Sequence, residues 1–288
     1  MEELLRGSVQ NKLMEVIKDI TRKLISPEFY EFLRSGRDSL SSILGWPAVY
    51  FHPWWGESAR RLEEYQDRFS GKRCFVIGNG PSLKNMDLSL LKDEYTFGMN
   101  RVYLAFKDWG FNTSFLVSVN DLVIEQCSQD FQNLDMPKFF SWRSKDLLLP
   151  EGTPDDQTHF LYSTYTGKKF ARRTIDRFWE GATVTYVCLQ LAYCMGFSEV
   201  ILIGVDHNFE TKGQASKTVV SNGADPNHFS PDYFGKGFRW QLPDLELSET
   251  AYRIANKVYR DAGRRVIDAT VDGKLNLFPK ADYLSLLM

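Results

Sequence analysis

The sequence predicts an α/β protein with a doubly wound, mostly parallel sheet, an N-terminal helical extension and a lid-like insertion. Three observations carry this prediction. From residue 73 onward, short apolar runs alternate with helical patterns, which is typical of a parallel sheet covered on both faces. Two glycines follow the first apolar run. Late in the chain, 204–241 is a polar segment of about 40 residues, and loops that long are often lids or binding loops.

The composition excludes several other classes of protein. Of the 288 residues, 43% are apolar and 25% are charged, and 35 basic against 37 acidic residues give a net charge of −2. Disordered chains combine low hydrophobicity with high net charge, and a membrane span needs about 18 uncharged apolar residues in a row. The sequence has neither feature. The balanced charge predicts no nucleic-acid partner.

The cysteines and the N-terminus indicate a reducing compartment. The four cysteines have neither CxxC spacing nor a zinc-like histidine partner, so we expect buried free thiols. They are Cys74, Cys127, Cys188 and Cys194. The first 20 residues have no apolar stretch of signal-peptide length. We therefore expect a cytoplasmic protein, with the inner face of the membrane as an alternative place.

Residues 1–70 form the predicted helical and aromatic extension. Apolar residues from Leu5 to Leu24 recur at three- and four-residue steps, the stripe of an amphipathic helix, and a second helix is predicted over about 57–68. The segment GWPAVYFHPWW lies between them. It either packs against the α/β core or, within residues 1–56, makes a homo-oligomer or peripheral membrane contact.

Residues 71–288 form the predicted catalytic domain. Its predicted strands are short, mostly apolar runs at 74–77, 96–100, 115–120, 138–142, 200–206 and 266–269. A helix is predicted over 183–195, because Gly196 is a usual residue just past a helix end. Another is predicted over 248–262, with Ser248 as its N-cap and Gly263 as its terminator. His52 and His159 lie in aromatic or strand-like surroundings, and we interpret both as structural.

The first site signal is Gly78-Asn79-Gly80-Pro81-Ser82, directly after a strand. Glycine permits a sharp turn and close approach of a ligand. Pro81 and Ser82 suit the first turn of a helix, whose free N–H groups attract phosphate. An ordinary tight turn is the alternative.

Polar side chains also follow other predicted strands. Asn100, Asn120 and Asp206 each stand at a strand end, and ligands of doubly wound sheets bind beyond the carboxyl ends of the strands. Amide and carboxylate groups there can bond ribose hydroxyls, a base edge or a phosphate. We therefore predict a nucleotide site at this edge, with Asp206 as one of its residues.

The second signal is the predicted lid, about 207–241. His228 could take a proton at neutral pH, and basic or phenolic groups such as Tyr233 could stabilise a leaving phosphate. The alternative is a solvated loop in which His207 and His228 have no role. Asp155-Asp156 follows a turn and is interpreted as a solvated loop rather than a metal pair.

Three blocks carry a resemblance to a known family: CFVIGNGPSLKNMDLSLL, TFGMNRVYL and GATVTYVCLQLAYCMGFSEVILIGVDHNF. They resemble the MptE-like family, which includes 6-hydroxymethylpterin diphosphokinases and the glycosyltransferase core of bacterial motility accessory factors. They are also similar to small bacterial sialyltransferases that use a CMP-activated sugar. The resemblance covers about residues 71–285 and implies a Rossmann-like, nucleotide-sugar-binding domain.

The resemblance also implies roles for particular residues. Gly78, Asn79 and Gly80 would hold the donor nucleotide, and Ser82 is added to them from its place in the first turn of the predicted helix. Asn100 and Asn120 would contact the nucleotide or sugar. Ala182 and Thr183 would bind the cytidine or its phosphate, and His228 would be the catalytic base. Those sialyltransferases have tyrosines where this chain has His207-Asn208-Phe209, so Tyr233 or a lysine would replace them.

Three functions remain open at this stage. The favoured one is an inverting glycosyltransferase that moves a CMP-linked, sialic acid-like nonulosonic acid to a glycan or other hydroxyl acceptor, with His228 as general base and no metal required. The second is a Mg²⁺-dependent diphosphokinase using ATP, with Asp121 and Asp206 as metal ligands. The third is a non-catalytic nucleotide-binding scaffold that recruits partners through its aromatic N-terminal segment.

Overall fold

The computed structural model describes residues 49–165, 167–211, 213–223 and 225–287. The chain divides into two compact units at residues 51 and 52. The amphipathic helix predicted from Leu5 to Leu24, and Trp46, lie outside the described residues. The unit that begins at His52 contains all the elements discussed below.

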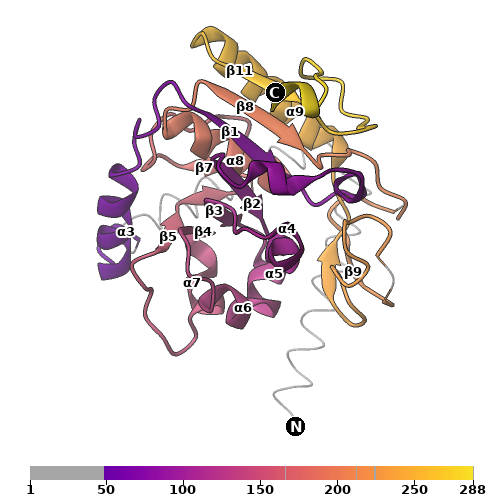
Figure 1. Cartoon of the computed structure of the whole chain (residues 1–288). Helices are drawn as coiled ribbons and strands as arrows, with labels where there is room; N and C mark the ends of the chain where they lie inside the picture. Colours follow the sequence, from indigo (N-terminus) through magenta and orange to yellow (C-terminus); the bar gives the residue numbers. More distant parts are fainter. Residues whose placement is uncertain (1–48, 166, 212, 224, 288) are drawn as a thin grey trace, which may run out of the picture. The chain divides into compact units, whose positions relative to one another are not determined.

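A seven-stranded parallel sheet is the centre of this unit (Figure 1). Its strand order is β11-β8-β1-β2-β3-β4-β5. The strands are β1 (Arg73–Ile77), β2 (Thr96–Met99), β3 (Phe115–Ser118), β4 (Lys138–Ser141), β5 (Thr158–Leu161), β8 (Glu199–Ile203) and β11 (Arg265–Asp268). This confirms the doubly wound fold. The edge strand β5 was not among the predicted strands, because a four-residue run with a histidine in it gives a weak apolar signal.

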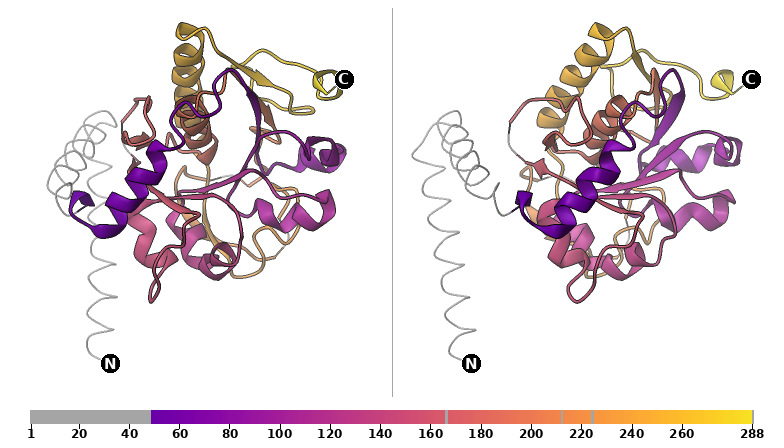
Figure 2. Two further views of the ribbon diagram at one scale, coloured as in Figure 1. Left: turned by 60° about the vertical axis from the view of Figure 1, so that its left-hand side comes forward. Right: turned by 90° about the vertical axis from the view of Figure 1, so that its left-hand side faces the viewer.

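Alternate residues of the strands enter two different cores, as the apolar runs predict. Cys74 and Val76 pack in the core beneath α8 (Val184–Cys194) and α9 (Leu245–Asp261). Phe75 and Ile77 pack in the other core. Figure 2 shows α8 and α9 side by side against one face of the sheet. The opposite side holds η1 (Pro81–Asn85), η2 (Leu88–Leu91) and η5 (Leu284–Leu286).

Short helices connect the strands β2 to β5. They are η3 (Val102–Ala105), α4 (Phe106–Trp109), α5 (Asp121–Gln126), α6 (Ser128–Gln132), η4 (Trp142–Ser144) and α7 (Lys145–Leu148). Two small strands, β6 (Ser163–Thr164) and β7 (Phe178–Trp179), form a parallel pair before α8.

Two predicted helices have different bounds from those expected. The helix predicted over about 57–68 is α3 (Pro53–Glu63), which begins early because the His52 ring accepts a bond from the Trp54 N–H, 3.2 Å. The helix predicted to begin at Ser248 begins at Leu245, because Asp244 is the residue that caps it. Gly263 does follow its C-cap, with φ +69°.

The aromatic residues that precede the sheet pack against its β5 edge. Trp54 stacks over Phe160 at a ring distance of 6.4 Å, and Trp55 meets Trp142 edge-on at 5.6 Å. These two tryptophans therefore pack against the α/β core, which is the first of the two alternatives for the aromatic segment. An oligomer or membrane contact through residues 1–56 stays a prediction.

The predicted lid is a folded hairpin and not a structureless loop. The strands β9 (Thr218–Val220) and β10 (Arg239–Gln241) pair antiparallel. The loop between them buries Tyr233 and Phe234 together with Trp240. The burial of these aromatic side chains explains why the segment is folded. Its polar, glycine-rich composition did not indicate this.

The four cysteines are free and buried, as predicted, and burial raises the pKa of each thiol. No helix among the described residues is long and apolar enough to cross a membrane.

His159 is a buried structural residue whose titration should weaken the fold in acid. Its ring is 3% exposed and packs against Tyr65 and Phe139. Neither ring nitrogen has a hydrogen-bond partner in the described part of the chain. Burial lowers the pKa of His159 to about 4, below the value of about 6.5 in an unfolded chain.

The stability linked to His159 is complete above pH 6.5 and is lost as the pH falls from 6.5 to 4, because the unfolded chain binds the proton first. Between pH 7 and pH 4.5, we expect the free energy of unfolding to fall by up to about 3 kcal/mol less in His159→Phe than in the wild type. The measurement is the free energy of unfolding in urea at pH 7 and at pH 4.5. His52→Asn, which keeps a capping side chain, is the control; an equal acid loss in His159→Phe and wild type would contradict the assignment.

Candidate active site

A cavity of about 220 Å³ lies beyond the carboxyl ends of the strands. Every residue predicted to bind the donor nucleotide or to act in catalysis, except Ser82, lines it. These residues are Gly78, Asn79, Gly80, Asn100, Asn120, Ala182, Thr183, Asp206, His228 and Tyr233. The fold thus brings together residues that are up to 155 positions apart in the sequence, counted from Gly78 to Tyr233.

The ends of β1 and β8 meet at the point where the order of the strands reverses. The chain proceeds from β1 to β5 on one side of the sheet and then returns to place β8 beside β1. A Cβ on Gly78 would lie 2.1 Å from the carbonyl oxygen of Gly204. A side chain at position 78 would therefore collide with the neighbouring strand end. This contact, and not the close approach of a ligand, explains why residue 78 is a glycine.

Asp206 occupies the position predicted for a phosphate. The Ser82 N–H donates to Oδ1 of Asp206, 3.1 Å, and the Ser82 hydroxyl donates to Oδ2, 2.7 Å. A Cβ on Gly80 would overlap this carboxylate, at 1.7 Å from Oδ2. The phosphate site expected at Pro81-Ser82 is thus already filled by a protein anion, and the turn that follows is only the short 3₁₀ helix η1. Burial raises the pKa of Asp206, while the two bonds from Ser82 oppose this shift.

Three asparagines stand at strand ends, and each has a different set of partners. Asn79 donates from Nδ2 to the carbonyl of Met99, 3.1 Å, but its buried Oδ1 has no partner in the described chain. Asn100 accepts from Ser118 at 2.9 Å, so its Nδ2 is the atom left to donate. Asn120 caps α5 with Oδ1. Asn79 therefore offers an acceptor, and Asn100 a donor, to a ligand.

The backbone is strained at three positions of the cavity wall. Asn100, Ala182 and His207 have φ values of +50°, +59° and +54°, in the left-handed region that side chains other than glycine rarely adopt. All three line the cavity. Strained residues tend to cluster at functional sites, where the surrounding structure holds them.

The first turn of α8 forms another part of the wall. Thr183 caps this helix by accepting a bond from the Thr185 N–H, 3.3 Å, and it lies 3.3 Å from the Tyr252 hydroxyl. The N–H of Val184, the first residue of the helix, has no acceptor within it. Ala182 and Val184 line the cavity on either side of Thr183. This helix end is suited to an anion.

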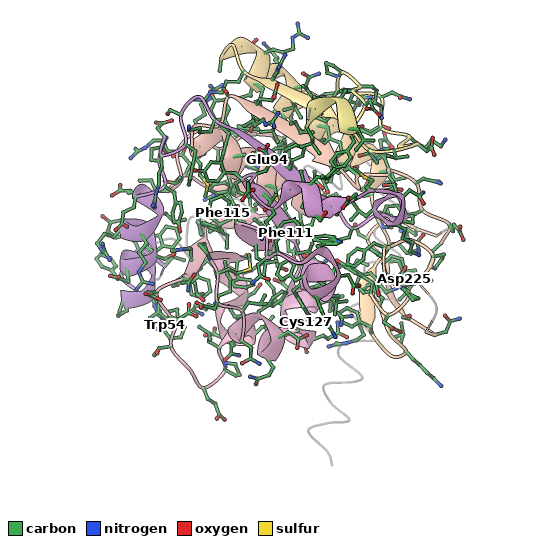
Figure 3. All side chains as sticks on the ribbon, viewed as in Figure 1. Trp54, Glu94, Phe111, Phe115, Cys127 and Asp225 are labelled. Atoms are coloured by element: carbon green, nitrogen blue, oxygen red, sulfur yellow. The ribbon has the colours of Figure 1, made fainter. Side chains whose placement is uncertain are left out.

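His228 is held by a buried carboxylate. Its Nδ1 lies 2.7 Å from Oδ2 of Asp225, and the two side chains are 12% and 5% exposed. The other oxygen of Asp225, a residue labelled in Figure 3, accepts from the Asn227 N–H at 2.9 Å. The imidazole lies flat on the Tyr233 ring at 4.0 Å. This leaves Nε2 as the ring nitrogen that Asp225 does not engage.

Tyr233 is placed to support His228 rather than to bind a phosphate. Its ring is 1% exposed, and its hydroxyl accepts a bond from the Arg101 N–H at 3.3 Å. Burial raises the pKa of this phenol. A lysine was the other predicted replacement for the sialyltransferase tyrosines. Lys217 and Lys236 do not line the cavity, and Lys212 lies outside the described residues. Among the residues described around the cavity there is no lysine or arginine.

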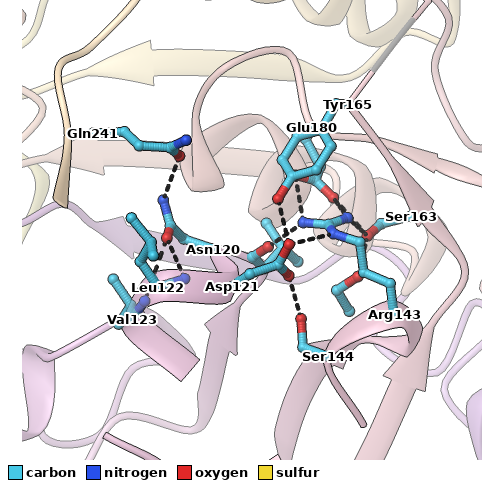
Figure 4. A network of polar contacts seen from close by, with 12 residues as sticks. Asn120, Asp121, Leu122, Val123, Arg143, Ser144, Ser163, Tyr165, Glu180 and Gln241 are labelled. Carbon is cyan, nitrogen blue, oxygen red and sulfur yellow. Dashed lines mark hydrogen bonds and ion pairs between the residues drawn. The ribbon is translucent and has the colours of Figure 1, made fainter. Parts of the chain in front are cut away.

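A polar network behind the cavity is centred on Arg143 (Figure 4). Arg143 pairs with the buried Glu180 and with Asp121 at 3.0 Å. It also donates to the carbonyl of Val119 at 2.6 Å. Because Val119 precedes Asn120 and Glu180 precedes the strained turn into α8, the network fixes two parts of the cavity wall relative to each other.

The same network engages Asp121, which was the first predicted magnesium ligand. Asp121 also accepts from Ser144 and from the Tyr165 hydroxyl, and it does not line the cavity. The nearby cation lowers the pKa of this carboxyl against the effect of burial. Asp206, the second predicted ligand, is bound to Ser82. No group of three or more metal-ligating side chains occurs in the described ranges.

The sequence interpretation missed Asp225, Arg143 and Glu180. Asp225 stands three residues before His228, and that spacing in a turn is the signal that could have suggested a pair. Arg143 and Glu180 are 37 residues apart and lie in segments without a motif, so only the fold brings them together.

Comparisons with known proteins match part of the chain to a known family. Residues 56–212 match the family described as 6-hydroxymethylpterin diphosphokinase MptE-like, a range that runs from α3 to just beyond β8 and ends before His228. Among solved structures, the chain is similar to a MAf glycosyltransferase from Magnetospirillum magneticum AMB-1, with 15% identity and a TM-score of 0.47. The match covers 80% of this chain and 38% of that one, so this chain spans about two fifths of its length. The search of curated proteins found no match.

Arg143→Met tests the network. The substitution leaves Glu180 buried without its cation, and breaking a buried ion pair in this way costs about 3–5 kcal/mol. Arg239→Met is the matched control, because it removes an exposed pair with Glu125, 2.9 Å, worth less than about 1 kcal/mol. Urea unfolding measures both, and equal losses would show that the Arg143 pair is not structural.

Proposed function

The chain belongs to the MptE-like family, and we propose that it is an inverting glycosyltransferase that uses a nucleoside monophosphate-linked sugar. The observation that carries this proposal is the His228–Asp225 pair in the wall of a cavity at the switch point of the sheet. Such switch points bind nucleotides in doubly wound folds. A histidine fixed through Nδ1 has Nε2 available as a base.

The cavity favours a donor with a single phosphate. Its described wall contains no lysine or arginine, and charge neutralisation for a diphosphate or triphosphate would need several cations or a metal. One phosphate can be met by the first turn of α8. Asn79 Oδ1, buried and without a partner, would accept from a donor group on the nucleotide. A CMP-linked nonulosonic acid, of the sialic acid type, fits this combination.

His228 is the proposed general base. Asp225 accepts the Nδ1 proton and so keeps the lone pair on Nε2, which takes the proton of the acceptor hydroxyl as its oxygen attacks the sugar. Attack on the face opposite the phosphate inverts the anomeric centre. The glycan or other acceptor would approach from the hairpin side, where His228 lies on Tyr233.

The hairpin is the proposed lid. The Arg239 N–H donates to Gln126 of α5 at 2.8 Å, and Gln126 donates back to the Arg239 carbonyl at 2.9 Å. Asn120 makes only a long 3.5 Å contact with Gln241. A cavity of about 220 Å³ is smaller than the roughly 300–1,000 Å³ of most ligand sites. A sugar nucleotide would therefore require these contacts to open and close.

The alternative is pyrophosphoryl transfer from Mg²⁺-ATP, which the description of the family suggests. The carboxylates in the described cavity wall do not fit a magnesium site well, because Asp206 is bound to Ser82 and Asp244 caps α9. We therefore propose that no metal is required. We also propose a cytoplasmic location, either at the inner face of the membrane or away from it. Residues 1–56 would make the homo-oligomer or peripheral membrane contact.

His228→Ala tests the base. We expect transfer from a CMP-linked sugar to fall by about 10²–10⁴-fold, the usual contribution of a general base, while CMP affinity stays within about threefold. Lys236→Ala in the same segment is the control, because this exposed side chain does not line the cavity. Normal turnover by His228→Ala would remove the proposed base. Nucleotide binding by the wild type without transfer to any acceptor would favour a scaffold.

EDTA separates the two enzymatic functions. We expect chelation to leave glycosyl transfer within about twofold of its initial rate, whereas a kinase needs Mg²⁺ on its phosphates. The measurement is product formation from a CMP-linked sugar and from ATP, each with EDTA and with added Mg²⁺. Turnover of ATP alone, abolished by EDTA, would establish the diphosphokinase instead.

A further inference from the structure

His207 is a second histidine in the cavity wall, and it has a carboxylate partner of its own. Its Nε2 lies 3.2 Å from Oε1 of Glu249 in α9, and its side chain is 9% exposed. The bond from His207 is the main cause that lowers the pKa of Glu249, so this carboxylate is charged at neutral pH. Arg253 pairs with the other oxygen of Glu249 at 2.8 Å.

The backbone at His207 is held in an unfavourable conformation. Its φ of +54° follows Asp206, whose carboxylate is fixed to Ser82. The chain therefore turns sharply as it leaves β8 and places the imidazole against α9. A residue kept at positive φ with a largely buried side chain suggests a function for that side chain.

The proposed reaction needs a positive group that the described wall otherwise lacks. A sugar nucleotide with one phosphate is a diester with one negative charge, and the departing nucleoside monophosphate approaches two, because its second pKa is about 6. With no lysine or arginine in the described wall, only histidines can become cations there. His228 is engaged by Asp225 and is needed as the base.

We infer that His207 is the catalytic residue that binds the leaving phosphate, and that Glu249 is its positioning residue. This inference rests on the glycosyltransferase function proposed above. An imidazole placed between a carboxylate and a phosphate is held as an imidazolium, with one N–H directed at each anion. Nε2–H donates to Glu249, and Nδ1–H donates to a phosphate oxygen. The other titratable groups at the ring are Asp206, which precedes it, and Tyr252 of α9 at a ring distance of 6.3 Å.

The two histidines then divide the reaction between them. The acceptor oxygen forms a bond to the anomeric carbon and gives its proton to Nε2 of His228. The bond from the anomeric carbon to the phosphate oxygen breaks, and its electron pair stays on that oxygen. The hydrogen bond from His207 strengthens as this charge develops, which is the condition for lowering the barrier.

The test compares the affinities of CMP and cytidine, which differ only in the phosphate, by titration calorimetry of the full chain. We expect the wild type to bind CMP at least about tenfold more tightly than cytidine, as one charge-assisted hydrogen bond allows. In His207→Asn this ratio should fall below about threefold. Asparagine removes the cation but tolerates positive φ, so the fold should persist.

A second readout is proton uptake when CMP binds at pH 8, measured in two buffers of different ionisation enthalpy. The wild type should take up a fraction of a proton, and His207→Asn should take up none, which a merely structural role would not cause. Glu249→Gln should reduce the uptake. His228→Asn is the matched control and should keep the CMP-to-cytidine ratio while transfer is lost.

The outcomes are distinguishable. If His207→Asn keeps both the ratio and the proton uptake, His207 does not bind the phosphate, while the proposed function stands. If the wild type binds neither CMP nor cytidine, the proposed donor is wrong, and the role of His207 falls with it.

Discussion

The contact between the ends of β1 and β8 is the constraint on which the site depends. The Gly204 carbonyl and the Asp206 carboxylate fill the space beside Gly78 and Gly80, so neither glycine can carry a side chain without moving the strand ends apart. Asp206 also holds the turn that follows β1 through Ser82. The cavity lies at this junction because the strand order reverses there.

Polar groups, most of them buried, fix the remaining walls against this junction. Arg143 links the end of β3 to the turn before α8, and Asp225 and Glu249 each orient one histidine. Since a buried pair contributes little net stability compared with apolar residues of the same shape, these groups are better understood as determinants of position. Together they hold the histidine rings and the asparagine amides of the cavity wall in fixed orientations.

The sequence predicts the sheet and the place of the site, but not its chemistry in detail. Apolar runs and the residues that end them predicted most strands, because parallel strands buried on both faces leave a clear signal. Asn79, Asn100 and Asp206 were found because they stand at those ends. The partners of these residues could not be predicted. Asp206 accepts hydrogen bonds from Ser82 and Arg143 pairs with Glu180, and both contacts join segments that are distant in the sequence. The aromatic core of the hairpin was hidden for the same reason, because its aromatic residues stand among polar residues and glycines in the sequence.

The most direct test of the proposed site is a crystal structure of the full chain with CMP. The predicted result is a nucleotide in the cavity between the β1–β8 junction and the first turn of α8, with a hydrogen-bond donor of the nucleotide within bonding distance of Asn79 Oδ1. A CMP molecule bound at another surface, with Asn79 Oδ1 still lacking a partner, would contradict the proposed nucleotide site.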